Sequence, residues 1–368
     1  MKDIQKKRIF SLDGQIIYED SLDHYQNGVL RLLGQPDELI EDFFKLTDSG
    51  LESTELSNLE EVCSRIHIAW NLARVNNGKL PLEFYKETSL RLETCFGPQI
   101  FNELIPLSGN PKLSLALNRS LGFGVLVDSI SHVRIKNIDT DYEQEYFNGD
   151  LPGIGYGDFS EQTWRLEKAT KQAKNLQILF ELIPGQRDVS EMSFLDVGSG
   201  YGHFLNSLKV QGAVVKGLDI SDFAASAAWQ QFGIETSAET LVDFVKSSKE
   251  RFDAISMWDY IEHPDDPGIE LDICHSLLHP NGLLIIKTPN IEALEFEVFS
   301  SDYHSLKKEH LNYFSLRSLT LLLISHGFKL VYSQGISHIF GGLKNIDLCS
   351  LAIANKKESD IFVIAQKI

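Results

Sequence analysis

The sequence predicts an α/β fold built on a doubly wound, mostly parallel seven-stranded sheet, with a mainly helical N-terminal domain before it. Two observations support this fold. From about residue 190, short apolar segments typical of strands alternate with segments of helical periodicity, a pattern that indicates a parallel sheet with helices on both faces. The strand segments hardly alternate between apolar and polar residues, as expected for strands that are buried on both sides.

Residues 1–145 have a different pattern and are expected to form the mainly helical N-terminal domain, whose role the sequence does not reveal. Residues 8–19 predict a β-hairpin about an Asp-Gly turn. Helices are expected at 60–75, after a capping-box spacing, and at 81–93, which begins with a proline. Residues 112–130 form a further apolar segment that glycines interrupt.

Residues 146–368 are expected to form the second domain, and 146–189 supply its linker and leading helix. Strands are then predicted at 193–199, 213–220, 234–238, 252–259, 282–289, 329–337 and 361–368. Helices are predicted at 161–183, 201–212, 223–233, 241–250, 266–280 and 315–328. No clear helix separates the last two strands, so they are expected to pair antiparallel at the sheet edge.

Composition and charge exclude several classes of function. The formal net charge of −18 disfavours binding to nucleic acid or to an anionic membrane. No segment approaches the run of about 20 apolar residues that spans a membrane, and no apolar segment typical of a secretory signal follows the first lysines. We therefore expect a cytoplasmic protein. No metal site or disulfide framework is predicted, because the cysteines form no C-x-x-C pair; they are Cys63, Cys95, Cys274 and Cys349.

A glycine-rich loop follows the first predicted strand of the sheet. Asp196, Gly198, Gly200 and Gly202 lie between this strand and the next predicted helix, and Asp219 ends the second strand. Glycines allow a tight turn and a close approach of the backbone to a ligand. An acid at the end of the second strand can accept hydrogen bonds from ribose hydroxyls, so this region predicts a nucleotide-type site.

The spacing of the loop bears on which nucleotide it binds. A dinucleotide fingerprint has a third glycine where this sequence has His203, which weakens the assignment to a nicotinamide cofactor. The acid before the first glycine also suits S-adenosylmethionine, whose sulfonium and ammonium groups are positive.

Residues from about 190 to 368 resemble the class I S-adenosylmethionine-dependent methyltransferases, and are most similar to the small-molecule branch that includes the ubiquinone-biosynthesis O-methyltransferases and glycan or antibiotic tailoring enzymes. The motifs that carry the resemblance are "LDVGSGYGHF", "GLDIS", "FDAISMWDYIEHPDDP", "LLHPNGLLIIKTPN" and "EHLNYFSLRSLTLLLISHGFKLV", in family order and spacing. The resemblance implies a Rossmann-like methyltransferase fold and O- or C-methylation of a small-molecule or glycan-type acceptor.

The resemblance also implies roles for individual residues. The loop glycines and Asp196 would lie against the methionine part of S-adenosylmethionine, and Asp219 would bind its ribose. Further contacts to the cofactor or to the edge of the acceptor pocket are expected from Ile220, Glu239, Thr240, Trp258 and Asp259.

Two histidines are candidates for the general base, and the sequence does not rank them. His263 follows the fourth strand of the sheet, and His310 lies in residues 301–315, an expected lid over the acceptor. Either histidine could instead have a structural role. The lid also carries a polar and aromatic set comprising Tyr303, His304, Glu309 and Tyr313.

Two alternatives to a methyltransferase stay open at this point. One is an NAD(P)-dependent oxidoreductase on the same architecture. The other is a noncatalytic partner protein that binds S-adenosylmethionine without turnover.

Overall fold

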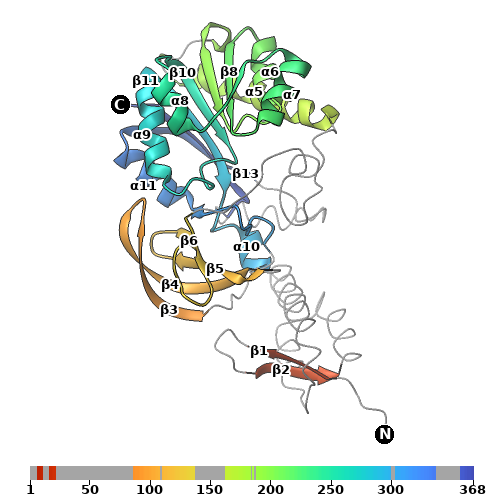
Figure 1. Ribbon diagram of the computed structural model, residues 1–368, viewed down its shortest axis with the longest axis vertical. Helices are drawn as coiled ribbons and strands as arrows, with labels where there is room; N and C mark the ends of the chain where they lie inside the picture. The colour runs from red at the N-terminus through yellow and green to blue at the C-terminus, as the bar shows by residue number, and fades with distance from the viewer. Residues whose placement is uncertain are drawn as a thin grey trace.

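The computed structural model describes residues 6–10, 16–21, 86–107, 110–136, 162–183, 185, 188–299, 303–336 and 357–368. These residues form three sheets: a large seven-stranded sheet, a five-stranded sheet and a two-stranded hairpin (Figure 1). The hairpin pairs β1 (Lys6–Phe10) antiparallel with β2 (Ile16–Ser21), as the sequence predicts. The helix expected at 60–75 and the linker expected at 146–160 lie outside the described residues.

The large sheet has the order β13-β14-β11-β10-β7-β8-β9, and each of its strands corresponds to a predicted one. Its strands are β7 (Ser193–Val197), β8 (Val214–Asp219), β9 (Thr236–Ala238), β10 (Phe252–Trp258), β11 (Leu278–Pro289), β13 (Phe328–Ile336) and β14 (Asp360–Lys367). β14 is antiparallel to both of its neighbours, β11 and β13, and the other pairs are parallel. The strand order reverses between β7 and β10, and ligands bind at the carboxyl ends of strands at such a switch point.

Helices cover both faces of the large sheet (Figure 1). On one face α5 (Gln162–Leu182), α6 (His203–Val210) and α7 (Asp222–Phe232) share an apolar core with the sheet. On the other face the core is shared with α8 (Leu241–Ser247), α9 (Pro267–Leu277) and α11 (Leu316–Ser325). This arrangement confirms the doubly wound architecture. Among the described helices, none is both long and apolar enough to cross a bilayer.

The described residues before position 130 are not helical, which corrects the expectation of a mainly helical N-terminal domain for this segment. They form an antiparallel sheet of order β12-β6-β5-β4-β3. Its strands are β3 (Lys86–Thr94), β4 (Gly97–Leu107), β5 (Asn110–Asn118), β6 (Phe123–Asp128) and β12 (Asn312–Phe314). The helix predicted at 81–93 is therefore wrong over residues 86–93, because pairing with β4 decides the conformation of this segment.

The small sheet is joined to the large one through its last strand. β12 comes from the C-terminal half of the chain and pairs antiparallel with β6. One face of the small sheet contributes Phe101, Phe123 and Val125 to the core shared with α9 and α11. The other face packs against α10 (Leu294–Phe299) and the segment before β12 (Figure 1). The segment predicted as a lid therefore packs against the small sheet.

Candidate functional site

The glycine loop connects β7 to α6 through three residues in the left-handed region. Gly198, Gly200 and Gly202 have φ values of 74°, 52° and 75°, which L side chains rarely adopt. The loop is tied to the end of β8, because the N–H groups of Gly198 and Ser199 both donate to the carbonyl of Leu218, at 2.8 and 3.1 Å. The loop is thus held open and bare at the switch point of the large sheet.

Asp219, the last residue of β8, holds the loop by its side chain. Its Oδ2 accepts the Gly200 N–H at 2.8 Å, and its Oδ1 accepts the Ser221 N–H at 3.0 Å. Burial raises the pKa of this carboxyl, although the two N–H groups act against the rise. A carboxylate oxygen can accept more than one hydrogen bond, so both oxygens keep capacity for ligand hydroxyls.

Asp196 lies on β7 beneath the loop and is almost fully buried. Ser256 of β10 donates its hydroxyl to Asp196 Oδ1 at 2.6 Å. Burial raises the pKa of Asp196 to about 7; the hydrogen bond from Ser256 opposes the rise, and the charge of Asp219 adds to it. A buried acid of this kind gains from a positively charged ligand group, which would favour its ionised form.

Gly198 faces the ring of Tyr260, which sequence reasoning did not single out. A Cβ added at Gly198 would lie 3.0 Å from Tyr260 Cδ2. The Tyr260 hydroxyl donates to Glu270 Oε2 at 3.1 Å, which fixes the ring in place. The loop therefore has no room for a side chain here, in addition to its positive φ.

Replacing Gly198 with alanine is expected to lower the free energy of unfolding by about 1–2 kcal/mol from the left-handed backbone alone, and by more because of the Tyr260 contact. Urea unfolding measures the loss. Gly97→Ala is the matched control, since Gly97 has a φ of 71° and an added Cβ would meet nothing within 4 Å. Equal losses in the two variants would contradict the close contact with Tyr260.

The remaining residues expected at the cofactor are placed around the ends of β8 and β9. Ile220 follows Asp219 and is 50% exposed. Glu239 and Thr240 follow β9. Thr240 caps α8 by accepting the Asp243 N–H at 3.1 Å, so its hydroxyl already has a structural partner. The cofactor contacts of these three residues stay predictions.

Trp258 is the last residue of β10 and Asp259 follows it, and their side chains have different surroundings. The Trp258 ring packs against Phe204 and Phe362, with centroids 5.0 and 5.8 Å away. Its indole Nε1 is buried and has no hydrogen-bond partner among the described residues. Asp259 has a φ of 55°, an uncommon conformation for a residue with a side chain.

A buried lysine holds Asp259 in this conformation. Lys287 Nζ lies 2.6 Å from Asp259 Oδ1 and 2.7 Å from Asp360 Oδ2, and the Asp259 N–H donates to the Lys287 carbonyl at 2.8 Å. Burial alone would lower the pKa of Lys287, but the charges of Asp259 and Asp360 outweigh it and raise the pKa. The network ties the end of β10 to β11 and β14.

The structure brings the two candidate bases together. The rings of His263 and His310 lie with their centroids 4.8 Å apart and nearly perpendicular. Burial lowers the pKa of His263 to about 4, and burial together with the charges of His263 and Lys307 lowers the pKa of His310. Both imidazoles are therefore neutral at pH 7, the form that can accept a proton.

Backbone hydrogen bonds explain why residues so far apart in sequence meet. The N–H groups of Leu311 and Asn312 both donate to the carbonyl of Glu262, at 2.9 and 3.0 Å. The Asn312 side chain donates to the Pro264 carbonyl at 2.6 Å. Arg134, after the small sheet, donates to Asn312 Oδ1 at 3.2 Å and to the Asp265 carbonyl. The predicted lid is thus fastened to the loop after β10.

Glu262 completes this cluster and was not predicted as a site residue. Its side chain is 2% exposed, and Thr288 donates to its Oε2 at 2.9 Å. Burial and the charge of Asp259 raise the pKa of Glu262 to about 8. The adjacent "EH" pair at 262–263 was the only local signal, and nothing in the sequence links it to His310.

The other residues expected on the lid have packing roles among the described residues. Tyr303 and Tyr313 are buried against the small sheet, and their hydroxyls donate to the carbonyls of Ser359 and Lys307. His304 stacks edge-on against Tyr303, with centroids 4.8 Å apart. The carbonyl of Glu309 bonds to His263. Acceptor contacts of these residues stay predictions.

S-adenosylmethionine, the cofactor that the sequence predicts, fits the donor set at the switch point. The loop carries no side chain at Gly198, Gly200 or Gly202, and a Cβ added at the first or last of them would press against neighbouring side chains of the protein. Asp196 offers a buried negative charge for an ammonium group, and Asp219 has free acceptor capacity for ribose hydroxyls. His203 is buried against Phe232 and stands where a dinucleotide site has its third glycine, the residue that allows close packing of helix and strand there.

Comparison with known proteins agrees with this arrangement. Residues 168–333 match a family model described as a methyltransferase domain. The chain is 30% identical over 125 residues to the ubiquinone biosynthesis O-methyltransferase of Pasteurella multocida, and 28% identical over 151 residues to that of Saccharophagus degradans. These alignments cover 30% and 38% of this chain, and 52% and 63% of the two relatives. The chain thus spans less than two thirds of the length of the curated relatives it matches.

Among solved structures, the chain is similar to an S-adenosylmethionine-dependent methyltransferase from Archaeoglobus fulgidus. The two are 19% identical, with a TM-score of 0.42, and the match covers 55% of this chain and 94% of the other.

Proposed function

We propose that this chain transfers a methyl group from S-adenosylmethionine to an oxygen or carbon of a small-molecule or glycan-type acceptor. Its residues 168–333 belong to the class I S-adenosylmethionine-dependent methyltransferases. Oxygen is the favoured attacking atom, because the relatives it matches are O-methyltransferases of ubiquinone biosynthesis.

One observation carries the proposal. A backbone loop with three left-handed glycines lies between two acids. The hydrogen bonds of the described residues leave each acid with capacity to bind a ligand group. Asp219 keeps acceptor capacity beyond its two N–H bonds. Asp196 is buried with a raised pKa and no cation beside it in the described residues. A ligand with a ribose and an ammonium group satisfies both.

Each part of the site then has a task in methyl transfer. S-adenosylmethionine supplies an electrophilic sulfonium methyl, so the protein mainly positions the reactants and excludes water. Asp219 would hold the ribose and Asp196 the ammonium group. After β10, the neutral imidazoles of His263 and His310 would accept the proton of an acceptor hydroxyl; their close contact and their neutral form support this role. Positioning of this kind can supply roughly 7–11 kcal/mol of barrier reduction at best.

Affinity for S-adenosylhomocysteine is expected to rise with pH, by about tenfold between pH 6 and pH 8. With a pKa of about 7, Asp196 is mostly protonated at pH 6 and mostly ionised at pH 8, and only the carboxylate attracts the ligand's ammonium group. Without ligand, the contribution of Asp196 to the free energy of unfolding changes with pH in the opposite direction. Because its pKa is raised from 3.8, this group contributes stability at low pH that is lost as pH rises through about 7.

Calorimetry at several pH values measures this effect. Asp196→Asn removes the titrating group and should flatten the profile over the same range. A wild-type affinity that does not change with pH, or an Asn variant that keeps the same slope, would contradict contact between Asp196 and the ammonium group.

Catalysis itself is tested by product formation. The full chain, incubated with methyl-labelled S-adenosylmethionine and fractions of a small-molecule extract, should release S-adenosylhomocysteine and label one fraction. Acceptor phenols and sugars can then be tried singly. Binding of S-adenosylhomocysteine without release from any fraction would instead favour a noncatalytic partner.

A further inference from the structure

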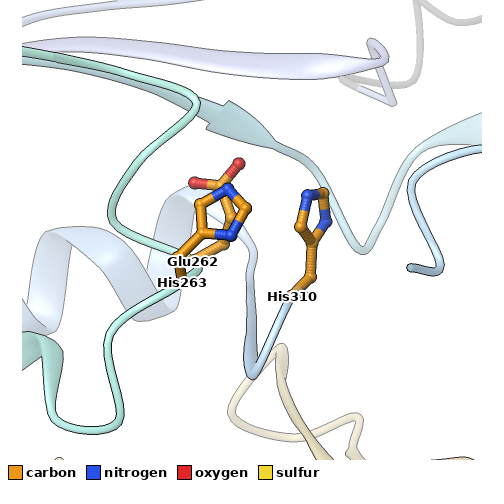
Figure 2. A group of neighbouring side chains, drawn as sticks. All are labelled: Glu262, His263 and His310. Carbon is orange, nitrogen blue, oxygen red and sulfur yellow. The ribbon is translucent and has the colours of Figure 1, made fainter. Parts of the chain in front are cut away.

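The two imidazoles on the acceptor side belong to segments that are far apart in the chain. His263 lies in the loop after β10 and His310 in the segment before β12, and Figure 2 shows their side chains next to each other. His263 Nδ1 lies 3.0 Å from the carbonyl of Glu309, and His310 Nδ1 lies 2.9 Å from the carbonyl of Ser305. The relative position of the two rings therefore depends on how the two segments are held together.

Asn312, the first residue of β12, lies at the junction of these segments and is fully buried. Its side-chain amide donates to the Pro264 carbonyl at 2.6 Å, and its backbone N–H donates to the Glu262 carbonyl at 3.0 Å. Its Oδ1 accepts a hydrogen bond from Arg134 Nη2 at 3.2 Å. One side chain thus binds both the loop after β10 and an arginine from the N-terminal half of the chain.

Arg134 joins three segments through one guanidinium group. Nη2 donates to Asn312 Oδ1 and also to the Asp265 carbonyl at 2.5 Å, and Nη1 donates to the Glu93 carbonyl of β3 at 3.3 Å. Nη1 also lies 3.5 Å from Asp265 Oδ1, and the Arg134 side chain is only 8% exposed. A guanidinium is a rigid planar fork that reaches several acceptors at once, so a lysine cannot reproduce this set of bonds.

The small sheet fixes the backbone of Arg134. Arg134 forms an antiparallel bridge with Val127 of β6, and the Ile135 N–H donates to the Leu126 carbonyl at 2.9 Å. The Leu126 N–H in turn donates to the Leu311 carbonyl at 3.2 Å. Arg134 is therefore anchored on a sheet whose strands β3 to β6 lie outside residues 168–333, the part that matches the methyltransferase family model.

We propose that Arg134 is a positioning residue for methyl transfer: through Asn312 and the Asp265 carbonyl it holds the loop after β10 where His263 and His310 meet the acceptor. Arg134 acts through these groups, since none of its bonds among the described residues reaches either imidazole. The small sheet is thereby part of the acceptor side of the site. This inference rests on the proposed function, in which the acceptor lies beside the imidazoles.

Replacing Arg134 with glutamine is expected to slow turnover without weakening cofactor binding. A displacement of about 1 Å at a reacting group can cost about 100-fold in rate, so we expect the rate to fall about 10- to 100-fold. The rate is that of S-adenosylhomocysteine release from saturating S-adenosylmethionine, in the extract fraction that the wild type labels. Affinity for S-adenosylhomocysteine should stay within about twofold, because the glycine loop lies at β7 and β8.

Three comparisons distinguish positioning from a general loss of stability. Arg134→Lys keeps a charge beside Asp265 and should recover part of the rate. Arg317→Gln is the matched control, because Arg317 donates to the Arg119 carbonyl and to Glu292 Oε1 but makes no bond to the loop after β10 among the described residues. Its rate should stay within about twofold of the wild type. Arg134→Gln combined with Asn312→Ala should lose less than the product of the two single losses, since both remove one connection.

Hydrogen exchange of the full chain tests the same claim without an acceptor. In Arg134→Gln, peptides covering residues 260–266 and 309–314 should exchange at least about tenfold faster than in the wild type, because their mutual bonds open more often. Peptides covering the glycine loop, residues 196–204, should exchange as before. Unchanged exchange in the first two peptides, or an equal increase in all peptides, would contradict a local positioning role.

The two measurements separate this inference from the proposed function. A wild type that transfers methyl groups, with an Arg134→Gln variant of equal rate, refutes only the inference. A wild type that neither binds S-adenosylhomocysteine nor transfers a methyl group refutes the proposed function, and local exchange in Arg134→Gln still supports Arg134 as the residue that holds the loop. If Arg134→Gln does not fold, Arg134→Lys replaces it, and a rate and an exchange pattern equal to those of the wild type would then overturn the inference.

Discussion

Replacing Lys287 with methionine is expected to lower the free energy of unfolding by about 3–5 kcal/mol. Lys287 Nζ lies within 2.7 Å of carboxylate oxygens of both Asp259 and Asp360, and the three side chains are 9%, 16% and 3% exposed. Methionine has a similar volume but no charge, so two largely buried carboxylates lose the cation that lies within hydrogen-bond distance of both. Breaking a buried ion pair from one side is far more costly than losing an exposed one.

Chemical denaturation measures the loss, and the chain offers a matched control. Lys216 also bridges two acids, Glu235 at 3.1 Å and Glu250 at 2.8 Å, but these acids are 73% and 53% exposed. Lys216→Met should therefore cost less than about 1 kcal/mol. Adding Asp259→Asn and Asp360→Asn to the Lys287 variant should recover part of the stability. Similar losses for Lys287→Met and Lys216→Met would refute a buried network.

Replacing Asp219 with alanine is expected to weaken binding of S-adenosylhomocysteine by roughly 1–3 kcal/mol, or about 5- to 150-fold in Kd. Two effects add. The ribose would lose its acceptor, and the Gly200 N–H, now held at 2.8 Å by Asp219 Oδ2, would lose the partner that orders the loop. Asn at this position keeps one acceptor oxygen, so its loss should be smaller.

Calorimetry on folded variants measures these affinities. Asp222→Ala is the control, because Asp222 is an exposed acid in the first turn of α7, close in sequence to the site. It should leave the affinity within about twofold of the wild type. If Asp219→Ala bound as tightly as the wild type, Asp219 would not be the ribose ligand.

The large sheet could be predicted from the sequence because its signals are local. Each strand is a short apolar run between helical segments, and the acids and glycines of the loop lie within a few residues of one another. The antiparallel pairing of β13 with β14 also followed from the sequence, which has no obvious helical pattern between these two segments.

The small sheet could not be predicted in the same way. Residues 86–93 contain good helix formers after a proline, yet Leu90 and Leu92 alternate with polar residues and pair with β4. The turn at Gly97, with its φ of 71°, was the available hairpin signal. β12 has only three residues and pairs with β6, far away in the chain, which no local pattern indicates.

On the acceptor side of the site, too, the residue types could be predicted from the sequence but their contacts could not. His263 and His310 could be chosen as candidates from their residue type and motif, but it is long-range bonds, such as those from the Leu311 and Asn312 N–H groups to Glu262, that bring them together. Lys287 reads in the sequence as one more residue of a buried strand. Its charge network depends on Asp259 and Asp360 from two other segments.

The central claim is that the glycine loop binds S-adenosylmethionine as a methyl donor. Calorimetry of the full wild-type chain against S-adenosylhomocysteine and, separately, against NAD tests it most directly. We expect one S-adenosylhomocysteine bound per chain and no comparable binding of NAD. Tight binding of NAD with no binding of S-adenosylhomocysteine would contradict the account and favour an oxidoreductase.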